Sequence, residues 1–169
     1  MDGDKQAVHD FWDGASCGED LYLEGHDEDH YRRQAEIRYQ LEPFIPEFAS
    51  FGQWKDKRVL EIGVGLGADH QRFAEAGAML TGVDLTARAT EHTRRRFREL
   101  GLTSDLRVAD AEKLPFADDT FDLVYSWGVL HHSPNTLRAV SEMLRVLRPG
   151  GTAKVMIYHA YSLVGFMLW

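Results

Sequence analysis

Short apolar runs alternate with amphipathic stretches along the chain from about residue 54 onward. The apolar runs predict buried strands over residues 58–62, 79–83, 106–109, 121–126 and 152–158. The amphipathic stretches predict helices over residues 68–76 and 87–100, and a third helix that begins at Pro134 and stops before Pro149. This alternation predicts an α/β fold with a Rossmann-like, doubly wound and mainly parallel sheet that helices cover on both faces.

Two of the predicted helices carry capping signals. Thr86 is a suitable N-cap and Gly101 a suitable stop for the helix over 87–100. Ser133 is the expected N-cap of the third helix, with Pro134 at its first position. The expected buried face of that helix consists of Leu137, Val140, Met143, Leu144 and Leu147.

Residues 1–53 follow a different pattern and are rich in aromatic and charged side chains. They predict one helix over 29–41, which ends before Pro43, and a second short helix around 46–51. We expect this segment to form an N-terminal helical cap over a core that spans residues 54–169. The cap would cover the carboxyl ends of the strands, where ligands bind in such sheets. The alternative is a helical segment that merely packs on the edge of the sheet.

Composition narrows the class of protein. The 169 residues are 44% hydrophobic and carry a formal net charge of −8, which suits one globular domain with a small appendage. No run of about 18 apolar residues predicts a membrane-spanning helix, and the first residues lack the pattern of a signal peptide. A single cysteine, Cys17, argues against a disulfide framework and favours a reducing, cytoplasmic location. The net acidity argues against nucleic acid as a partner.

Three glycines, Gly63, Gly65 and Gly67, follow the first predicted strand and open a helix. About twenty residues further on, Asp84 ends the second strand, where a carboxylate can accept hydrogen bonds from two ribose hydroxyls. Up to this point, a nicotinamide cofactor and S-adenosylmethionine (SAM) fit the pattern equally well.

Two further acids separate these cofactors. Glu61 lies in the first strand just before the turn, where it would repel the pyrophosphate of a dinucleotide; SAM has instead an amino group and a sulfonium cation. Asp110 ends the third strand and can accept a hydrogen bond from an adenine amino group, while the Ala111 N–H can reach a ring nitrogen. Because the carboxyl ends of parallel strands meet at one edge, we expect Glu61, Asp84 and Asp110 to line one crevice.

The sequence resembles class I SAM-dependent methyltransferases, and among them the ubiquinone/menaquinone C-methyltransferase-like (methyltransferase type 11 domain) group. The resemblance rests on VLEIGVGLGAD, TGVDLT, VADAEKLPFADDTFDLVYSWGVLHH and LRVLRPGG, and it covers residues 57–158. It implies methyl transfer from SAM to a small-molecule acceptor by in-line displacement at the sulfonium methyl, with S-adenosylhomocysteine (SAH) as the product. The sequence does not specify the acceptor. A SAM-binding module without catalysis and a nicotinamide-dependent oxidoreductase are the alternatives.

The resemblance also implies roles for individual residues. Together with Glu61, the residues assigned to the cofactor are Gly63, Gly65, Gly67, Asp84, Leu85, Asp110, Ala111, Ser126 and Trp127. The glycines would line the methionine part, with Ser126 and Trp127 at its border. Leu85 would pack on the adenine ring.

Two histidines, His131 and His132, follow the fourth strand close to the expected position of the transferred methyl group. Imidazole titrates near neutral pH, so either is a candidate base that removes a proton from the acceptor. The alternative is that one packs on or caps the next helix and the other bonds the backbone. We expect no metal, because His26 and His30 lie among acids typical of a solvated helix start.

Two other features bear on the surface of the domain. The run of arginines at 94–98 is interpreted as a solvated helix face that pairs with local acids. Class I methyltransferases usually have seven strands, whereas the pattern here predicts five, so we expect either a fragment or a shortened domain, without strands six and seven. The fifth strand would then be an exposed sheet edge through which copies of the chain can self-associate.

Overall fold

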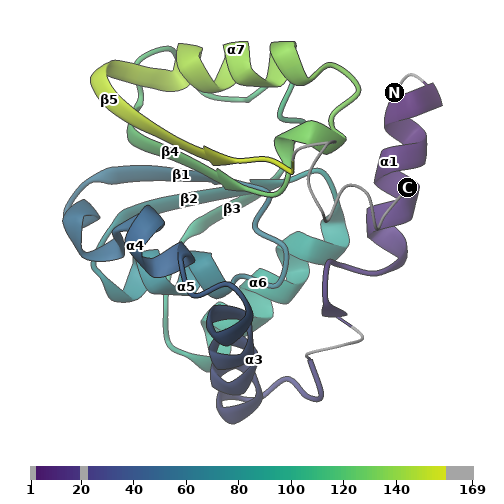
Figure 1. Cartoon of the computed structure of the whole chain (residues 1–169), viewed down its shortest axis with the longest axis vertical. Helices are drawn as coiled ribbons and strands as arrows, with labels where there is room; N and C mark the ends of the chain where they lie inside the picture. Colours follow the sequence, from purple (N-terminus) through teal and green to yellow (C-terminus); the bar gives the residue numbers. More distant parts are fainter. Residues whose placement is uncertain (1–2, 20–22, 159–169) are drawn as a thin grey trace.

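The computed structural model describes residues 3–19 and 23–158 (Figure 1). Within them, one sheet of parallel strands has the order β3-β2-β1-β4-β5. The strands are β1 (Arg58–Ile62), β2 (Met79–Asp84), β3 (Asp105–Val108), β4 (Phe121–Trp127) and β5 (Leu147–Met156). The expected α/β class with a parallel sheet is confirmed, and β5 forms one edge of the sheet. Self-association through that edge stays a prediction.

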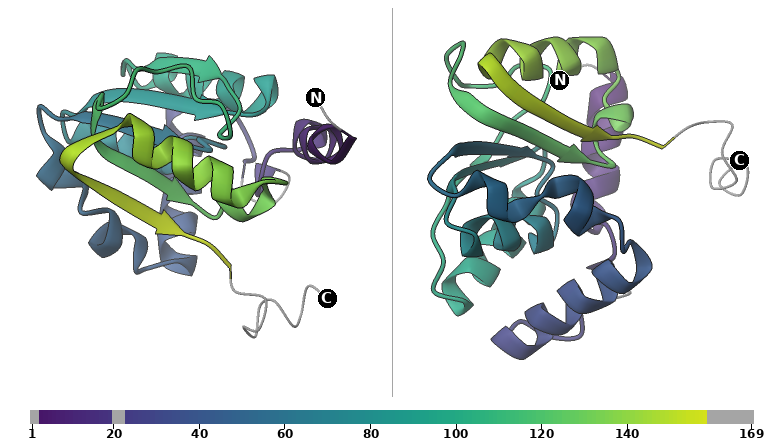
Figure 2. Two further views of the ribbon diagram at one scale, coloured as in Figure 1. Left: turned by 90° about the horizontal axis from the view of Figure 1, so that it is seen from above. Right: turned by 60° about the vertical axis from the view of Figure 1, so that its left-hand side comes forward.

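Helices cover both faces of the sheet. On one face lie α5 (Ala68–Glu75) and α6 (Ala87–Glu99), together with α4 (Ile45–Ala49); on the other lies α7 (Thr136–Val146), as Figures 1 and 2 show. The chain passes from β1 to β2 and β3 in one direction and then returns to place β4 on the other side of β1. The carboxyl ends of the paired strands β1 and β4 therefore form the switch point at which such sheets bind ligands.

Alternate residues of β1 point into two separate hydrophobic cores. Leu60 and Ile62 belong to the core beneath α7, whereas Val59 belongs to the core that contains Phe73 of α5 and Phe97 of α6. All the residues of β1 after Arg58 are buried. Burial on both faces explains why this strand is almost continuously apolar, and why Glu61 stands out within it.

The start of α7 differs from the prediction. The helix begins at Thr136, and its N-cap is Asn135, whose side chain accepts a hydrogen bond from the Arg138 N–H at 3.0 Å. Ser133 instead ends a short 3-10 helix, η2 (Leu130–His132), and its hydroxyl donates to Glu112. Asparagine is as good an N-cap as serine, so the local sequence offers both starts. The contact with Glu112 engages the Ser133 hydroxyl elsewhere.

The predicted buried face of α7 is partly wrong. Leu137 and Leu144 are 81% and 55% exposed, whereas Ala139, Met143 and Val146 are buried against the sheet. These three residues are spaced by four and three positions and form one stripe. The prediction placed Leu137 and Leu144 on the buried face because they are large and apolar, but they lie beside this stripe.

The beginning of β5 was also predicted too late. The strand starts at Leu147, directly after α7, and includes Pro149 and the two following glycines. A register shift separates the pair Phe121–Leu147 from Leu123–Thr152. An irregularity on an edge strand is a position where proline and glycine are tolerated, so these residues mark a distortion within β5 and not a loop before it.

The N-terminal segment contains a helix that the sequence pattern did not reveal. This helix, α1 (Gly3–Gly14), stands beside the carboxyl ends of the strands (Figure 1). It is followed by α3 (Glu28–Leu41), by α4, and by a 3-10 helix, η1 (Phe51–Trp54). The helix predicted over 29–41 corresponds to α3, whose N-cap Asp27 accepts from the His30 N–H. No residue of α1 is fully buried, which explains the weak pattern.

Candidate functional site

A cavity of ≈ 250 Å³ lies at the carboxyl ends of β1, β2 and β4. The predicted site residues that line it are Glu61, Gly63, Gly65, Gly67, Asp84, Leu85, Asp110, Ala111, Trp127 and His132. The three acids therefore share one cavity. Their convergence follows from the topology, because each stands at or near the end of a parallel strand.

Two predicted site residues lie outside the cavity wall. Ser126 is fully buried, and its hydroxyl donates to the Ile62 carbonyl at 3.0 Å, so it joins β4 to β1. The His131 ring packs against Tyr158, with the ring centres 5.2 Å apart, and its buried Nδ1 has no partner among the described residues. Burial lowers the pKa of His131 to about 4. Neither residue belongs to the cavity lining.

The glycine turn is built from left-handed backbone. Gly63, Gly65 and Gly67 have φ angles of 85°, 51° and 80°. A Cβ atom at Gly63 would overlap the Val129 side chain, so a larger residue there would force Val129 to move. The Gly63 N–H donates to the Val83 carbonyl at 2.8 Å and closes the turn onto β2. The turn thus exposes bare backbone to the cavity.

Asp84 supports this turn from the end of β2. One carboxylate oxygen accepts from the N–H and the hydroxyl of Thr86, at 3.0 and 3.1 Å, and the other accepts from the Gly65 N–H at 3.3 Å. Burial raises the pKa of Asp84, and these hydrogen bonds oppose the rise. Asp84 therefore presents acceptor oxygens to the cavity and fixes the glycine turn at the same time.

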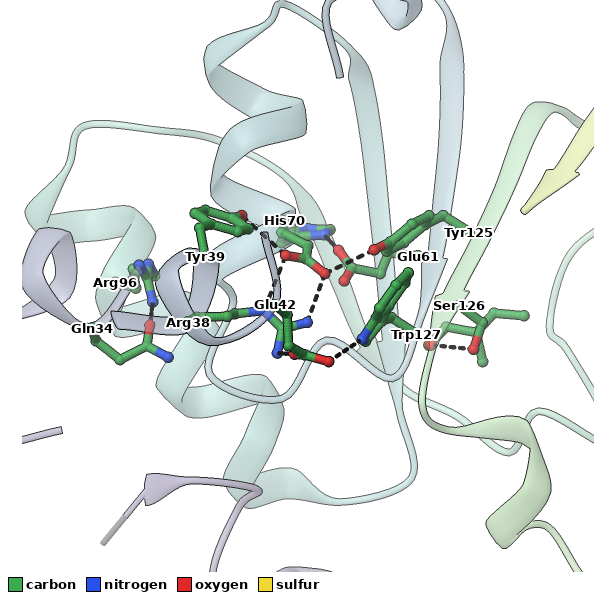
Figure 3. A network of polar contacts seen from close by, with 12 residues as sticks. Gln34, Arg38, Tyr39, Glu42, Glu61, His70, Arg96, Tyr125, Ser126 and Trp127 are labelled. Carbon is green, nitrogen blue, oxygen red and sulfur yellow. Dashed lines mark hydrogen bonds and ion pairs between the residues drawn. The ribbon is translucent and has the colours of Figure 1, made fainter. Parts of the chain in front are cut away.

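Glu61 begins a chain of polar side chains in which His70 is buried and Ser104 is half-buried. Its Oε2 lies 2.8 Å from His70 Nδ1 (Figure 3). His70 Nε2 lies 2.8 Å from the Ser104 hydroxyl. The Ser104 hydroxyl donates to the Leu80 carbonyl at 2.9 Å. Burial, together with the nearby Asp69 carboxylate, raises the pKa of Glu61 well above its ordinary value. Burial lowers the pKa of His70 to about 3.

Helix α1 closes the cavity on the side of Asp110. Lys5 lies 2.6 Å from Asp110 Oδ2 and 2.8 Å from Glu112 Oε2, and Val8 and Trp12 also line the cavity. The Trp12 ring contacts His132, with the ring centres 5.1 Å apart. Sequence reasoning missed Lys5 and Glu112, because nothing local links a lysine on the first helix to acids more than a hundred residues away.

A family model described as "Methyltransferase domain" matches residues 60–155, which is more than half of the chain and includes the glycine turn and the acids. The chain belongs to this methyltransferase domain family. The cofactor of the domain is SAM, and its fold is that of the class I methyltransferases.

Individual relatives agree with this assignment. The chain is 35% identical over 133 residues to the uncharacterized protein Rv1405c of Mycobacterium tuberculosis, a match that covers 79% of the chain and 48% of the relative. It is 37% identical over 101 residues to the sterol 4-C-methyltransferase strm-1 of Caenorhabditis elegans, covering 59% of the chain and 30% of the relative. The chain therefore spans about half the length of Rv1405c.

A solved structure gives the same result for the fold. The SAM-dependent methyltransferase from Mesorhizobium loti superimposes with a TM-score of 0.61 at 26% identity. The match covers 69% of this chain and 54% of the other.

The cavity of this methyltransferase domain suits SAM better than a dinucleotide. Among the residues that the structure describes, none donates a hydrogen bond to the second oxygen of Glu61, Oε1, which leaves an acceptor for the ligand. The lysine and the arginine on the cavity wall, Lys5 and Arg38, both contact acids. A pyrophosphate would meet mainly carboxyl groups here, whereas a sulfonium and an ammonium group are matched to them.

A second polar cluster joins the N-terminal segment to the glycine turn of the methyltransferase domain. Asp69, in the first turn of α5, accepts hydrogen bonds from the Arg38 guanidinium and from the hydroxyls of Tyr39 and Tyr125, at 2.9 to 3.1 Å (Figure 3). Asp69 is 3% exposed and lines the cavity. The cluster fixes α3 against α5 and β4, and sequence reasoning did not find it.

Arg96 corrects the expectation that the arginine run is a solvated face. Its side chain is fully buried, and burial lowers its pKa to about 10. Its guanidinium donates to Gln34 and to the carbonyls of Tyr31 and Leu66, as well as to Gln71. Arg98, by contrast, has a largely exposed side chain. Arg96 thus ties α3 to the glycine turn.

No helix in the described ranges is both long enough and apolar enough to cross a membrane.

The pKa of Glu112 gives the domain an acid-sensitive contact with α1. Burial raises this pKa, but hydrogen bonds from Lys5, Ser133 and the Asn135 N–H outweigh burial and lower the pKa from 4.5 to about 2. A lowered carboxyl pKa stabilises the fold above the unfolded-state pKa, and this stabilisation is lost as the pH falls toward 2.

We therefore expect Glu112→Gln to lower the free energy of unfolding most at neutral pH. Between about pH 4.5 and 2, where the wild-type carboxylate becomes protonated, the difference between the two proteins should shrink. Urea unfolding at a series of pH values measures it. A difference that stays constant over the whole series would contradict the assigned role of the Glu112 charge.

Proposed function

We propose that the protein containing this domain transfers a methyl group from SAM to a small, largely apolar organic acceptor. The observation that carries the proposal is the composition of the cavity wall. Carboxyl groups and bare backbone lie on one side, and the side chains of Trp12, Trp127, Val129 and Tyr158 lie on the wall as well. Concave apolar walls with a few polar groups are typical of small-molecule sites. The similarity to a sterol methyltransferase supports an acceptor of this class.

In this proposal the chain binds and orients the cofactor. When bound, SAM supplies a methyl group on a positively charged sulfur that a nucleophile can attack in line. Asp84 would accept from the ribose hydroxyls, Asp110 with the Ala111 N–H would hold the adenine, and the glycine turn would border the methionine part. Trp12 and Trp127 would keep water from the acceptor, and much of the rate enhancement would come from this positioning.

His132 is the better of the two candidate bases. It lines the cavity, whereas His131 does not. Burial lowers the pKa of His132, so the imidazole is neutral at pH 7 and can accept a proton from the acceptor. We propose His132 as the base and assign no catalytic role to His131.

We further propose that residues 1–53 act as a lid on the cavity. The contacts of α1 with Asp110, Glu112 and His132 support this role, since Asp110 and His132 line the cavity and Glu112 binds the same lysine as Asp110. A cytoplasmic location is proposed on the basis of the single, exposed cysteine, Cys17.

The experiment is a transfer assay with methyl-labelled SAM and a panel of small apolar acceptors that includes a sterol, a quinol and a phenol. We expect label in the organic extract, and a rate about 100-fold lower for His132→Gln with SAH affinity unchanged. His131→Gln is the matched comparison and should have a much smaller effect. Label found only in protein or nucleic acid would refute the small-molecule acceptor, and equal losses in the two variants would refute the choice of His132.

A further inference from the structure

The contacts of the Glu61–His70–Ser104 chain restrict where its hydrogen atoms can lie. The Ser104 hydroxyl has one hydrogen, which it donates to the Leu80 carbonyl at 2.9 Å. It must therefore accept at the 2.8 Å contact with His70 Nε2. It follows that His70 Nε2 carries a hydrogen.

The contact between His70 Nδ1 and Glu61 Oε2, also 2.8 Å, then needs one more hydrogen. Either Glu61 is a carboxylic acid that donates to a neutral imidazole, or His70 is an imidazolium that donates to a carboxylate. The two arrangements contain the same number of protons. The Glu61 side chain is 4% exposed and the His70 side chain is 0% exposed. Burial favours the uncharged forms of both groups. Burial thus favours, in the ligand-free protein, the arrangement with a protonated Glu61 and a neutral His70.

The charges around Glu61 come from three elements. Asp69 on α5 and Asp84 on β2 disfavour a negative charge on Glu61, and Arg38 on α3 favours one. Asp69 is itself held by Arg38 and by the Tyr125 hydroxyl of β4. The effects of the two acids and of Arg38 on a negative charge at Glu61 partly cancel. A positive charge on a ligand would therefore decide whether Glu61 is ionised.

The His70 ring has a fixed position. It packs on Phe97 of α6, with the ring centres 5.0 Å apart, and a Cβ atom at Gly82 would lie 2.6 Å from the ring. The ring cannot turn without losing both hydrogen bonds. A proton from Glu61 can move only to Nδ1, where it would make an imidazolium whose two N–H groups both have acceptors.

We propose that the Glu61–His70–Ser104 chain adjusts the charge of the cavity to that of its ligand, and so makes it prefer a sulfonium over a neutral thioether. This inference rests on the proposed function. When a cationic ligand lies against Glu61, the O–H bond of Glu61 breaks and an N–H bond forms at His70 Nδ1. No proton enters or leaves the protein. With a neutral ligand the proton returns to Glu61, so the product is held less tightly than the methyl donor.

The test is nitrogen NMR of the His70 ring in the wild-type chain. We expect Nδ1 to be unprotonated in the free protein and with SAH, and both ring nitrogens to be protonated with SAM, over about pH 6 to 8. Calorimetry of SAM binding in buffers of different ionisation enthalpy should show no net proton exchange. The same ring protonation in all three states would overturn the proposal, as would release of a proton on SAM binding.

Variants provide a second readout that does not depend on activity. His70→Phe removes the proton acceptor and should lower the preference for SAM over SAH by roughly tenfold or more, because a charge-assisted hydrogen bond is lost, with little change in SAH affinity. Ser104→Ala should lower the preference by a smaller factor. Ser141→Ala, whose hydroxyl only donates to the Leu137 carbonyl on the surface of α7, is the control and should leave the preference unchanged.

The two proposals fail in different ways. If SAH does not bind to the wild-type chain, the proposed function fails. If SAH binds and the preference for SAM is the same in His70→Phe and wild type, only the role of this chain of side chains fails. If His70→Phe is unfolded, the NMR result on the wild-type chain decides.

Discussion

Replacement of Arg96 by methionine is expected to lower the free energy of unfolding by about 3–5 kcal/mol. The fully buried guanidinium donates to Gln71, Gln34 and the carbonyls of Leu66 and Tyr31, at 2.7 to 2.9 Å. Methionine fills part of the space but leaves these acceptors buried without donors. Because three elements meet at this side chain, the loss should also loosen the glycine turn. Urea unfolding monitored by fluorescence measures the change.

Arg98→Met is the matched control, because Arg98 lies on the same helix with a side chain that is 63% exposed. Its effect should stay within about 0.5 kcal/mol. Equal effects of the two substitutions would show that Arg96 does not connect the N-terminal segment to the turn.

Asp84→Ala is expected to weaken SAH binding by roughly 1–3 kcal/mol, the usual scale for losing hydrogen bonds to a charged group. The same carboxylate accepts from the Gly65 N–H, so the substitution also removes a support of the glycine turn. Calorimetric titration of the variant with SAH gives the affinity. Asp105→Ala, at the exposed start of β3, is the control because it removes the same charge. This variant should bind SAH as the wild type does. Unchanged affinity in Asp84→Ala would remove Asp84 from the ribose role.

Part of the sheet could be predicted because its central strands, β1 and β4, are buried on both faces. The strand predicted at 58–62 coincides with β1, and Thr86 caps α6 as expected. The errors fall where one local signal competes with another. Ser133 and Asn135 are both suitable caps, and only the contact of Ser133 with Glu112 decides between them. The start of β5 depends on pairing with β4, which no local pattern encodes.

The site could be predicted where the topology alone brings residues together. Glu61, Asp84 and Asp110 follow from strand ends, and all three line the cavity. Arg96 and Lys5 could not be predicted, because a charged residue on a helix normally indicates a solvated face. Their positions depend on how the N-terminal segment packs on the core.

Calorimetric titration of the wild-type chain with SAH and, separately, with NAD tests the central claim most directly. The claim is that the acids and the glycine turn form a single cavity for a sulfur-containing nucleoside and not for a diphosphate. The account predicts saturable binding of SAH with one site per chain and no binding of NAD. Binding of NAD without binding of SAH would contradict it.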